Sequence, residues 1–301
     1  MHKAGFVNIV GNPNVGKSTL MNLLMGERIS IATFKAQTTR HRIMGIINEP
    51  EAQIVFSDTP GVLKPNYKLQ ESMLAFSEGA LQDADVLLYV TDVVEKPDKN
   101  ADFLTKVQRL MVVGIDGKKI PVLLLINKID ESNQKALEEL ATAWHEVLPQ
   151  AEIYPISAKM KFGVDMVLRR IKELLPDSPP YFDKDQWTDK PARFFVTEII
   201  REKILLYYDK EIPYACEVNV ESFKETEHNI HIHATIYVER DSQKGIIIGH
   251  HGVALKKVST EARKTLERFF QKSIYLEVFV KVDKDWRQNE QRLEAYGYKL
   301  D

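Results

Sequence analysis

Cysteine is nearly absent from this chain of 301 residues, in which Cys216 is the single example. One cysteine cannot form an intramolecular disulfide, and a thiolate metal cluster would lack ligands. Disulfides persist in oxidising compartments and are rare in the cytoplasm. The sequence therefore predicts a reducing, cytoplasmic location.

Long apolar runs are missing as well. No segment approaches the roughly 20 apolar residues that a membrane-spanning helix requires. The first residues, MHKAG, lead into an apolar strand-like run without the features of a secretion signal. Low-complexity segments and internal repeats are also absent. We expect a soluble protein, and the sequence leaves peripheral contact with the inner face of the cell membrane open.

The chain has no strong excess of charge, since 41 basic and 43 acidic residues give a formal net charge of -2. No protein-wide basic field exists to hold nucleic acid, so any such contact requires a local patch, and DNA is not an expected partner. A hydrophobic fraction of 44% and a charged fraction of 28% are typical of a globular chain. The length is sufficient for roughly two domains.

The sequence does contain a glycine-rich loop, GNPNVGKS, directly after the apolar run 6–10. Its spacing of glycine, four free positions, glycine, lysine and serine is that of a phosphate-binding loop. The glycines let N–H groups point at a polyphosphate, and the helix that begins near Ser18 directs its positive dipole end to the same anion. Lys17 supplies charge for the outer phosphates, and the Ser18 hydroxyl suits Mg²⁺. A dinucleotide-binding loop is excluded because Pro13 occupies the place of its second glycine. The predicted phosphate-binding residues are Gly11, Asn12, Pro13, Asn14, Val15, Gly16, Lys17, Ser18 and Thr19.

Apolar strand candidates alternate with helical stretches through about residue 175. The candidates are residues 6–10, 43–47, 53–56, 86–90, 122–126 and 153–156. Runs that are apolar at every position are typical of strands covered on both faces. We therefore predict an α/β domain of the P-loop NTPase type, with a mostly parallel sheet flanked by helices and ligands at the carboxyl ends of its strands.

Polar residues follow three of these strands. Asp58, Thr59, Pro60 and Gly61 end the strand at 53–56; the carboxylate of Asp58 can hold Mg²⁺, and Gly61 leaves its N–H free for a terminal phosphate. The strand at 122–126 is followed by Asn127, Lys128 and Asp130, and the strand at 153–156 is followed by Ser157, Ala158 and Lys159.

These last two groups predict a site for guanine. The Asp130 carboxylate can accept from the N1–H and exocyclic amine of guanine, Asn127 can pair with the other edge, and the Lys128 stem can cover the ring. Adenine offers neither donor, so a buried Asp130 would lose its partners at a cost of roughly 1–3 kcal/mol per group. The N–H of Ala158 could meet the guanine carbonyl oxygen.

In this order the motifs resemble the GTPase set, and residues 31–42, IATFKAQTTRHR, resemble the first switch of the bacterial Era GTPases. A switch threonine of GTPases ligates Mg²⁺, which makes Thr38 and Thr39 alternative ligands beside Ser18 and Asp58. Many GTPases place a water-orienting glutamine where this chain has Val62. The resemblance therefore implies slow hydrolysis, a second moving loop at 60–72 and K⁺ as a further candidate cofactor at Asn14. The residues expected to act in hydrolysis are Lys17, Asn14, Thr38, Thr39 and Gly61.

A second domain follows a proline-rich segment. We predict a GTP-binding domain at 1–175, a linker at 176–191 and a domain of order helix, strand, strand, helix, helix, strand at 192–301. The turn GHHG at 249–252 between two helices, preceded by three isoleucines, is the device of an α+β type II KH domain, which receives about four unpaired bases. Between residues 244 and 272 seven basic residues outnumber two acidic ones. The predicted RNA-binding residues are Ile248, Gly249, His250, His251, Gly252, Lys256, Lys257 and Arg263.

The resemblance to Era extends over essentially the entire chain and implies a GTPase that binds the 3′ region of small-subunit (16S) rRNA and assists assembly of the 30S subunit, with a monomer as the default state. KH turns usually carry a lysine or arginine, whereas this turn has histidines, so RNA affinity is expected to depend on pH or on Lys256 and Lys257. Two alternatives stay open. One is a GTP-dependent regulator of a protein or membrane partner, and the other is an RNA-binding module with a silent nucleotide site.

Two further features favour a structural role over a functional one. His231 and His233 would share one side of a strand but lack further ligands of metal-site spacing, so we expect them to be surface residues. Trp286 and the neighbouring tyrosines could stack on bases, but more readily close the core.

Overall fold

The computed structural model describes residues 2–97 and 99–299 and divides them into two compact units. The first unit holds residues 2–66 and 70–189, and the second holds residues 67–69 and 190–299. Residues 1, 98, 300 and 301, which belong to the predicted domains, lie outside the described residues. The predicted boundaries at 175 and 191 stay a proposal.

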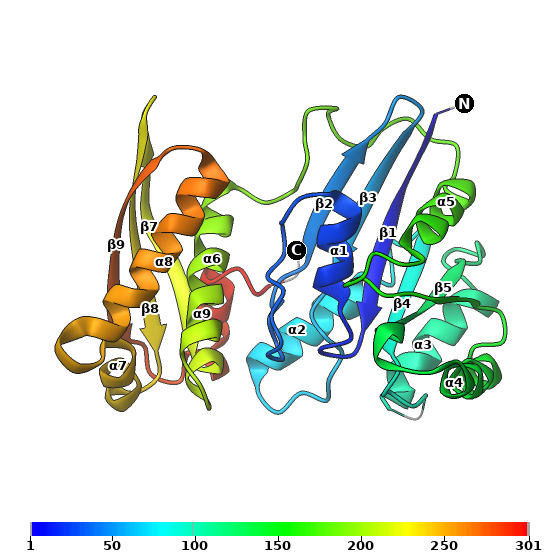
Figure 1. Cartoon of the computed structure of the whole chain (residues 1–301), viewed down its shortest axis with the longest axis horizontal. Coiled ribbons are helices and arrows are strands. Elements are labelled where there is room, and N and C mark those ends of the chain that lie inside the picture. Colours follow the sequence, from blue (N-terminus) through cyan, green and yellow to red (C-terminus); the bar gives the residue numbers. More distant parts are fainter. Residues whose placement is uncertain (1, 98, 300–301) are drawn as a thin grey trace. The chain divides into compact units, whose positions relative to one another are not determined.

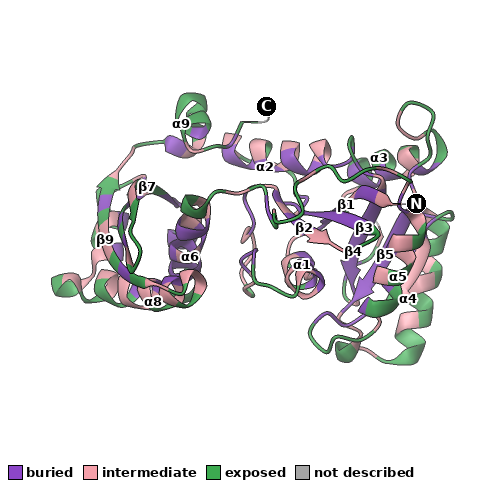
Figure 2. Cartoon of the chain, turned by 90° about the horizontal axis from the view of Figure 1, so that it is seen from above, coloured by how far each residue is buried: buried purple, intermediate pink, exposed green. Residues whose placement is uncertain are grey.

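The first unit is built on a mostly parallel sheet, which confirms the predicted fold class. Its strands in the described part of the chain are β1 (Lys3–Gly11), β2 (Ile43–Asn48), β3 (Ala52–Asp58), β4 (Val86–Asp92), β5 (Val122–Asn127) and β6 (Glu152–Pro155). They lie in the order β2-β3-β1-β4-β5-β6, in which β2 is antiparallel to β3 and the other pairs are parallel. Every residue of β3, β4 and β5 is buried (Figure 2), as expected for strands covered on both faces.

Helices cover both faces of this sheet. They are α1 (Lys17–Met25), α2 (Lys68–Gly79), α3 (Ala101–Val112), α4 (Gln134–Val147) and α5 (Val164–Leu174). In Figure 1, α1 stands in front of the sheet and α2 lies behind it. Phe103 of α3 and Trp144 of α4 pack with Tyr89 and Leu124 of the sheet in one buried cluster. The loops that leave the carboxyl ends of the strands are thereby held on a rigid frame.

Most of the segment predicted as a linker is hydrogen-bonded to the first unit. The N–H groups of Tyr181 and Phe182 donate to Gln53 Oε1 over 2.7 and 3.0 Å. Thr188 Oγ1 donates to the Met44 carbonyl over 2.7 Å. These bonds fix residues 181–188 along the edge of β2 and the start of β3.

The second unit has the predicted order of elements. They are α6 (Ala192–Tyr207), β7 (Cys216–Glu225), β8 (Asn229–Val238), α7 (Asp241–Ile248), a 3-10 turn (His250–Gly252), α8 (Val253–Phe270), β9 (Ser273–Val282) and α9 (Glu290–Ala295). β8 lies between an antiparallel β7 and a parallel β9. Apolar side chains of α6 and α8, among them Ile200 and Leu266, pack on the sheet. Trp286 and Tyr298 are buried in this unit, as expected for core residues rather than stacking platforms.

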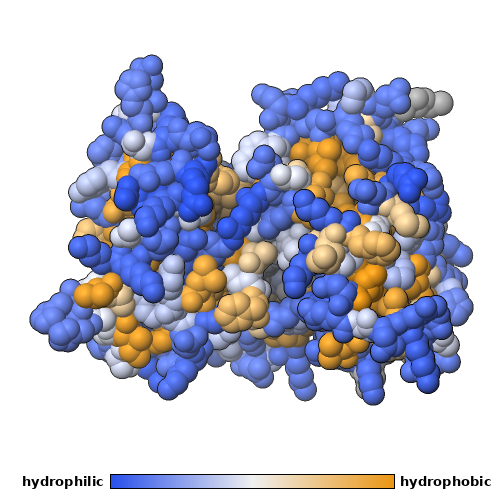
Figure 3. Space-filling view, viewed as in Figure 1, coloured by the Kyte–Doolittle hydropathy of each residue, from blue (hydrophilic) through white to orange (hydrophobic). Residues whose placement is uncertain are grey.

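The face seen in Figure 3 is mostly hydrophilic and carries separate apolar patches. Exposed apolar side chains include Phe34, Met160, Phe162 and Val253. Among the described residues, no helix is both long enough and apolar enough to cross a bilayer.

Candidate nucleotide site and nucleic-acid interface

The glycine-rich loop connects β1 to α1, and its conformation requires Gly16. This residue has a φ of 98°, in the left-handed region that favours glycine. A Cβ at this position would lie 2.3 Å from Asn127 Nδ2. The loop and the end of β5 therefore approach each other at a distance that only glycine allows.

Lys17 is buried within this loop. Its ammonium donates to the carbonyl oxygens of Gly11 and Asn12 over 3.0 and 2.7 Å. Burial lowers the pKa of Lys17 to about 8, although the charges of Asp58 and Glu95 act in the opposite direction. A polyphosphate would offer charged acceptors to the same ammonium and favour its protonated form.

Three oxygen-bearing side chains meet at the end of β3. Ser18 Oγ donates to Asp58 Oδ2 over 2.7 Å and lies 2.8 Å from Thr39 Oγ1, which itself lies 3.3 Å from the same carboxylate oxygen. Asp58 is fully buried, and its Oδ1 has no hydrogen-bond partner among the described residues. Burial raises the pKa of Asp58 against the effects of Lys17 and the hydroxyls. Hydroxyl and carboxylate oxygens with one acceptor left unpaired fit Mg²⁺.

The structure separates the two candidate threonines. Thr39 faces Ser18 and Asp58, whereas Thr38 Oγ1 donates to the Lys35 carbonyl over 2.6 Å. The sequence could not distinguish the two threonines, because the directions of neighbouring side chains in an irregular loop follow no regular pattern.

The segment after Asp58 is fixed at several points. Thr59 Oγ1 donates to the Ile9 carbonyl over 2.7 Å, and Ser77 Oγ donates to the Pro60 carbonyl over 2.8 Å. A Cβ on Gly61 would lie 2.7 Å from the Pro13 Cα, so the segment packs directly against the phosphate-binding loop. Val62 is 4% exposed and belongs to the core cluster behind the sheet.

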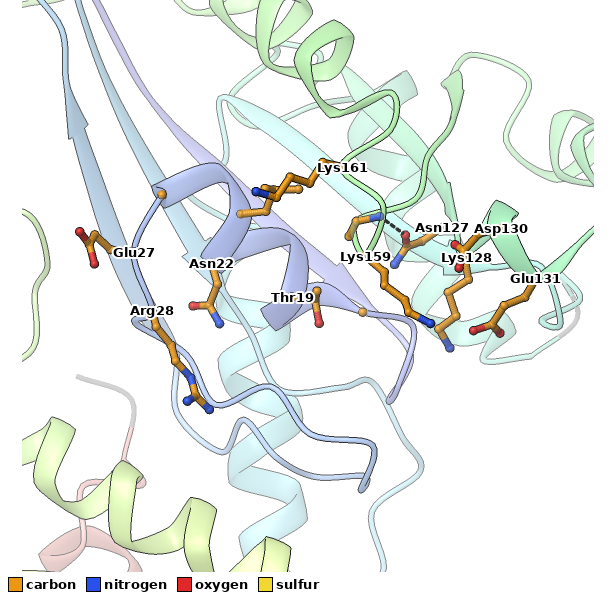
Figure 4. A pocket seen from close by; sticks show the side chains of 14 residues that line it. Thr19, Asn22, Glu27, Arg28, Asn127, Lys128, Asp130, Glu131, Lys159 and Lys161 are labelled. Carbon is orange, nitrogen blue, oxygen red and sulfur yellow. Dashed lines mark hydrogen bonds between the residues drawn. The ribbon is translucent and has the colours of Figure 1, made fainter. Parts of the chain in front are cut away.

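A cavity of about 740 Å³ opens between α1 and the loops after β5 and β6 (Figure 4). Its predicted lining residues are Gly16, Thr19, Asn127, Lys128, Asp130, Ala158 and Lys159. Sequence reasoning missed the others, which are Asn22, Leu23, Gly26, Glu27, Arg28, Glu131 and Lys161. These seven residues form no sequence motif. Their positions close to the predicted motifs are the one signal that could have indicated them.

Asn127 makes two contacts that the sequence did not predict. Its Nδ2 donates to the Val15 carbonyl over 2.8 Å, and its Oδ1 accepts from the Ala158 N–H over 2.9 Å. The amide and the Ala158 N–H, both predicted to contact the base, therefore bond to each other. Asn127 fastens the phosphate-binding loop to the loop after β6, and it shapes the cavity through those contacts.

Asp130 and Lys128 also have protein partners that the sequence did not indicate. Asp130 is exposed rather than buried, and the Ser157 hydroxyl donates to it over 2.6 Å, which holds its pKa below the usual range. The expected discrimination against adenine requires that Asp130 is shielded from water. Because the carboxylate is exposed, the bound base itself must shield it. Lys128 Nζ lies 2.6 Å from Asp92 Oδ2, a buried partner that the motifs did not indicate.

In the second unit, the turn between α7 and α8 has the conformation that its glycines allow. Gly249 and Gly252 have φ values of 72° and 75°. The rings of His250 and His251 are exposed, and their centroids lie 4.0 Å apart. Of the preceding isoleucines, Ile247 is buried in the core and Ile246 is half exposed, so the apolar surface beside the turn is smaller than the sequence predicted.

Both acidic residues of the predicted basic patch are paired with basic ones. Arg263 Nη1 lies 2.7 Å from Glu267, and Lys264 lies 2.8 Å from Glu261. Lys256 is exposed, and Lys257 Nζ lies 4.3 Å from the ring centre of Tyr207, an aromatic residue that sequence reasoning did not include.

His231 and His233 are exposed on β8. Within residues 2–97 and 99–299 no group of three His, Cys, Asp or Glu side chains could hold a metal ion. His233 instead lies 2.7 Å from Glu277 on the neighbouring strand. This agrees with the expected surface role.

Comparisons with known proteins match both units. Residues 6–128 match the family described as 50S ribosome-binding GTPase, and residues 211–287 match the KH domain. GTPase Era of Geobacter metallireducens is 44% identical over 98% of this chain and 98% of its own length. The chloroplastic GTPase ERA-like protein of Oryza sativa subsp. japonica is 44% identical over 99% of this chain and 70% of its own length.

Solved structures agree. A crystal structure of Era in complex with MgGDPNP and nucleotides 1506–1542 of 16S ribosomal RNA has a TM-score of 0.91 and 37% identity, and covers 100% of both chains. A variant of Aquifex aeolicus Era bound to GDP and AlF4⁻ also has a TM-score of 0.91, with 37% identity, and covers 99% of this chain and 100% of its own. The likeness includes both the nucleotide-binding unit and the KH unit.

Proposed function

Because this chain belongs to the Era family of GTPases, we propose that its KH domain binds the 3′ region of 16S rRNA and that its nucleotide state controls this binding during assembly of the 30S subunit. The protein binds GTP and GDP with Mg²⁺ and hydrolyses GTP. The observation that carries the rRNA proposal is the likeness, over 100% of both chains, to the Era complex with a 16S rRNA fragment.

The roles of the site residues follow from their contacts. We propose that Lys17 binds the outer phosphates and that Ser18, Thr39 and Asp58 hold Mg²⁺, directly or through water. Gly61 would turn its N–H to the terminal phosphate. The cavity beside Asp130 would hold guanine, with Ser157 keeping the carboxylate ionised and oriented.

Hydrolysis must proceed without a glutamine at position 62. We propose slow turnover, and K⁺ as a further cofactor at Asn14, an exposed loop residue with a φ of 66°. Asn14→Ala should lose any stimulation by KCl over NaCl, measured as released phosphate. Equal rates of the parent protein in both salts would exclude a K⁺ site.

We further propose that the protein acts as a monomer in the cytoplasm and makes no more than peripheral contact with the membrane. Light scattering of the purified protein tests the monomer. Fractionation of cells, with a salt wash of the membranes, tests the location.

Crosslinking in cells, followed by sequencing of the bound RNA, tests the rRNA proposal. We expect reads concentrated at the 3′ end of 16S rRNA, fewer of them when the GHHG turn is changed to GDDG. Reads spread over unrelated messages would contradict the proposal. Absence of RNA crosslinks would favour the alternative, a regulator of a protein or membrane partner.

A further inference from the structure

Asn100 stands at the start of α3, but its side chain does not cap that helix. An asparagine at this position usually accepts a hydrogen bond from the second or third N–H of its own helix. Among the described residues Asn100 has no such bond, and its backbone has a φ of 61°, in the left-handed region. Asparagine tolerates this conformation better than most residues. The side chain is thereby directed away from its own helix.

The amide of Asn100 instead joins two segments of the nucleotide site. Its Nδ2 donates to Asn12 Oδ1 of the phosphate-binding loop and, over 3.1 Å, to the carbonyl oxygen of Val62. Both partners accept, so the bonds use the two N–H groups of one amide. Asn12 is 2% exposed, and its own carbonyl accepts from Lys17.

Val62 is thus held in three ways. Its side chain is buried in the core cluster, its N–H donates to the Gly11 carbonyl over 3.0 Å, and its carbonyl accepts from Asn100. Gly61 precedes it directly and packs on Pro13. The peptide before Val62 is therefore held by the Gly11 carbonyl of the loop, and the peptide after Val62 is held by Asn100.

We propose that Asn100 is a positioning residue for GTP hydrolysis. Its amide ties the Val62 carbonyl to Asn12 of the phosphate-binding loop, so that the preceding Gly61 is held in place before GTP arrives. Preorganised donors contribute most where charge develops in the transition state. Residue 62 of this chain carries no amide side chain that could orient the attacking water. Hydrolysis therefore depends on the position of the backbone at Gly61 and Val62. The inference rests on GTP hydrolysis alone and not on the rRNA proposal.

Two substitutions remove the donors without forcing the backbone. Asn100→Gly keeps the left-handed conformation, and Asn100→Asp keeps the size of the side chain while replacing the donors with an acceptor. We expect kcat for GTP to fall about tenfold in both variants, while KM and the affinity for GTP stay within about twofold. Hydrolysis is measured without RNA, so that failure of the rRNA proposal does not affect the result.

Asn133→Asp is the matched control, because Asn133 starts α4 in the same unit and accepts from the Ala136 N–H over 3.0 Å, a bond that Asp also makes. Its kcat should equal that of the parent. The proposal is overturned if kcat of the Asn100 variants stays within about twofold of the parent. It is equally overturned if the affinity for GTP falls as far as kcat, or if the control loses as much activity.

Discussion

Thr39 Oγ1 lies 2.8 Å from Ser18 Oγ, and both hydroxyls lie next to the same oxygen of the Asp58 carboxylate. Ser18 belongs to the start of α1, Asp58 ends β3, and Thr39 comes from the irregular segment between α1 and β2. Three elements thus place oxygen atoms around one point, where the unpaired Asp58 Oδ1 is also buried. If Mg²⁺ binds at this point, as proposed, the position of the switch segment is linked to occupancy of that site.

The first prediction separates the adjacent threonines. Thr39→Ala should weaken Mg²⁺-dependent GTP binding by about tenfold or more, because it removes a metal-facing oxygen. Thr38→Ala should change it by less than about threefold, since the Thr38 hydroxyl bonds to the Lys35 carbonyl. Titration of Mg²⁺ against a fluorescent GTP analogue measures both. The reverse order would contradict the assignment of Thr39.

The second prediction concerns the approach of the phosphate-binding loop to β5. Gly16→Ala should lower GTP affinity by about a hundredfold or more, because the new Cβ would lie 2.3 Å from Asn127 Nδ2 and would push apart the loop and the cavity wall. Calorimetry with GDP and Mg²⁺ measures the affinity.

Gly117→Ala is a matched control for strain alone. Gly117 has a φ of +81°, also left-handed, but a Cβ there would meet nothing within 4 Å. We expect a small loss of thermal stability and unchanged affinity for GDP. Equal losses of affinity in both variants would show that backbone strain, rather than the contact with Asn127, limits binding.

The sequence predicted much of the fold, because strand and helix periodicity and the placement of motifs depend on local patterns. Each predicted strand of the first unit appears in β1 to β6, and the KH order of elements is confirmed. The attachment of residues 181–188 to β2 and Gln53 could not be predicted, since a polar, proline-bearing segment has no periodicity that indicates its partner.

The sequence predicted many residues of the candidate site but not the contacts between them. Motifs place Asn127 and Ala158 at the carboxyl ends of neighbouring strands, but only the register of those strands brings the two together. Likewise the pairing of Arg263 with Glu267 depends on side-chain conformations that a count of charges ignores. Asn100 went unnoticed because its partners are 38 and 88 residues away in sequence.

The third prediction follows from the burial of Lys17, which lowers its pKa to about 8 from its ordinary value of 10.5. In the free protein the Nζ should titrate near pH 8, and with GDP and Mg²⁺ the titration should move upward, because the phosphates favour the charged form. NMR of the lysine side-chain signals measures this, and Lys17→Arg assigns the signal by its loss. A titration unchanged by GDP would contradict contact with phosphate.

The sign of the effect on stability follows from the same shift. The unfolded chain keeps this proton to higher pH than the folded chain does. Burial of Lys17 therefore costs stability fully below pH 8, and the cost falls as the pH rises toward 10.5. Urea unfolding of the free protein at several pH values measures it, with Lys17→Met as the reference that lacks the titrating group.

The fourth prediction distinguishes two cations of the KH unit. Lys256 is exposed at the start of α8, whereas Arg263, two turns later, is paired with Glu267 over 2.7 Å. A cation already paired with a carboxylate releases fewer counterions when it meets a phosphate. Lys256→Ala should therefore weaken binding of a single-stranded fragment from the 3′ end of 16S rRNA and lower the slope of log affinity against log salt by about 0.7. Arg263→Ala should leave the slope unchanged, and anisotropy measured over a series of KCl concentrations gives both values. Loss of slope in Arg263→Ala alone would mean that RNA displaces Glu267 and that the ion pair is part of the interface.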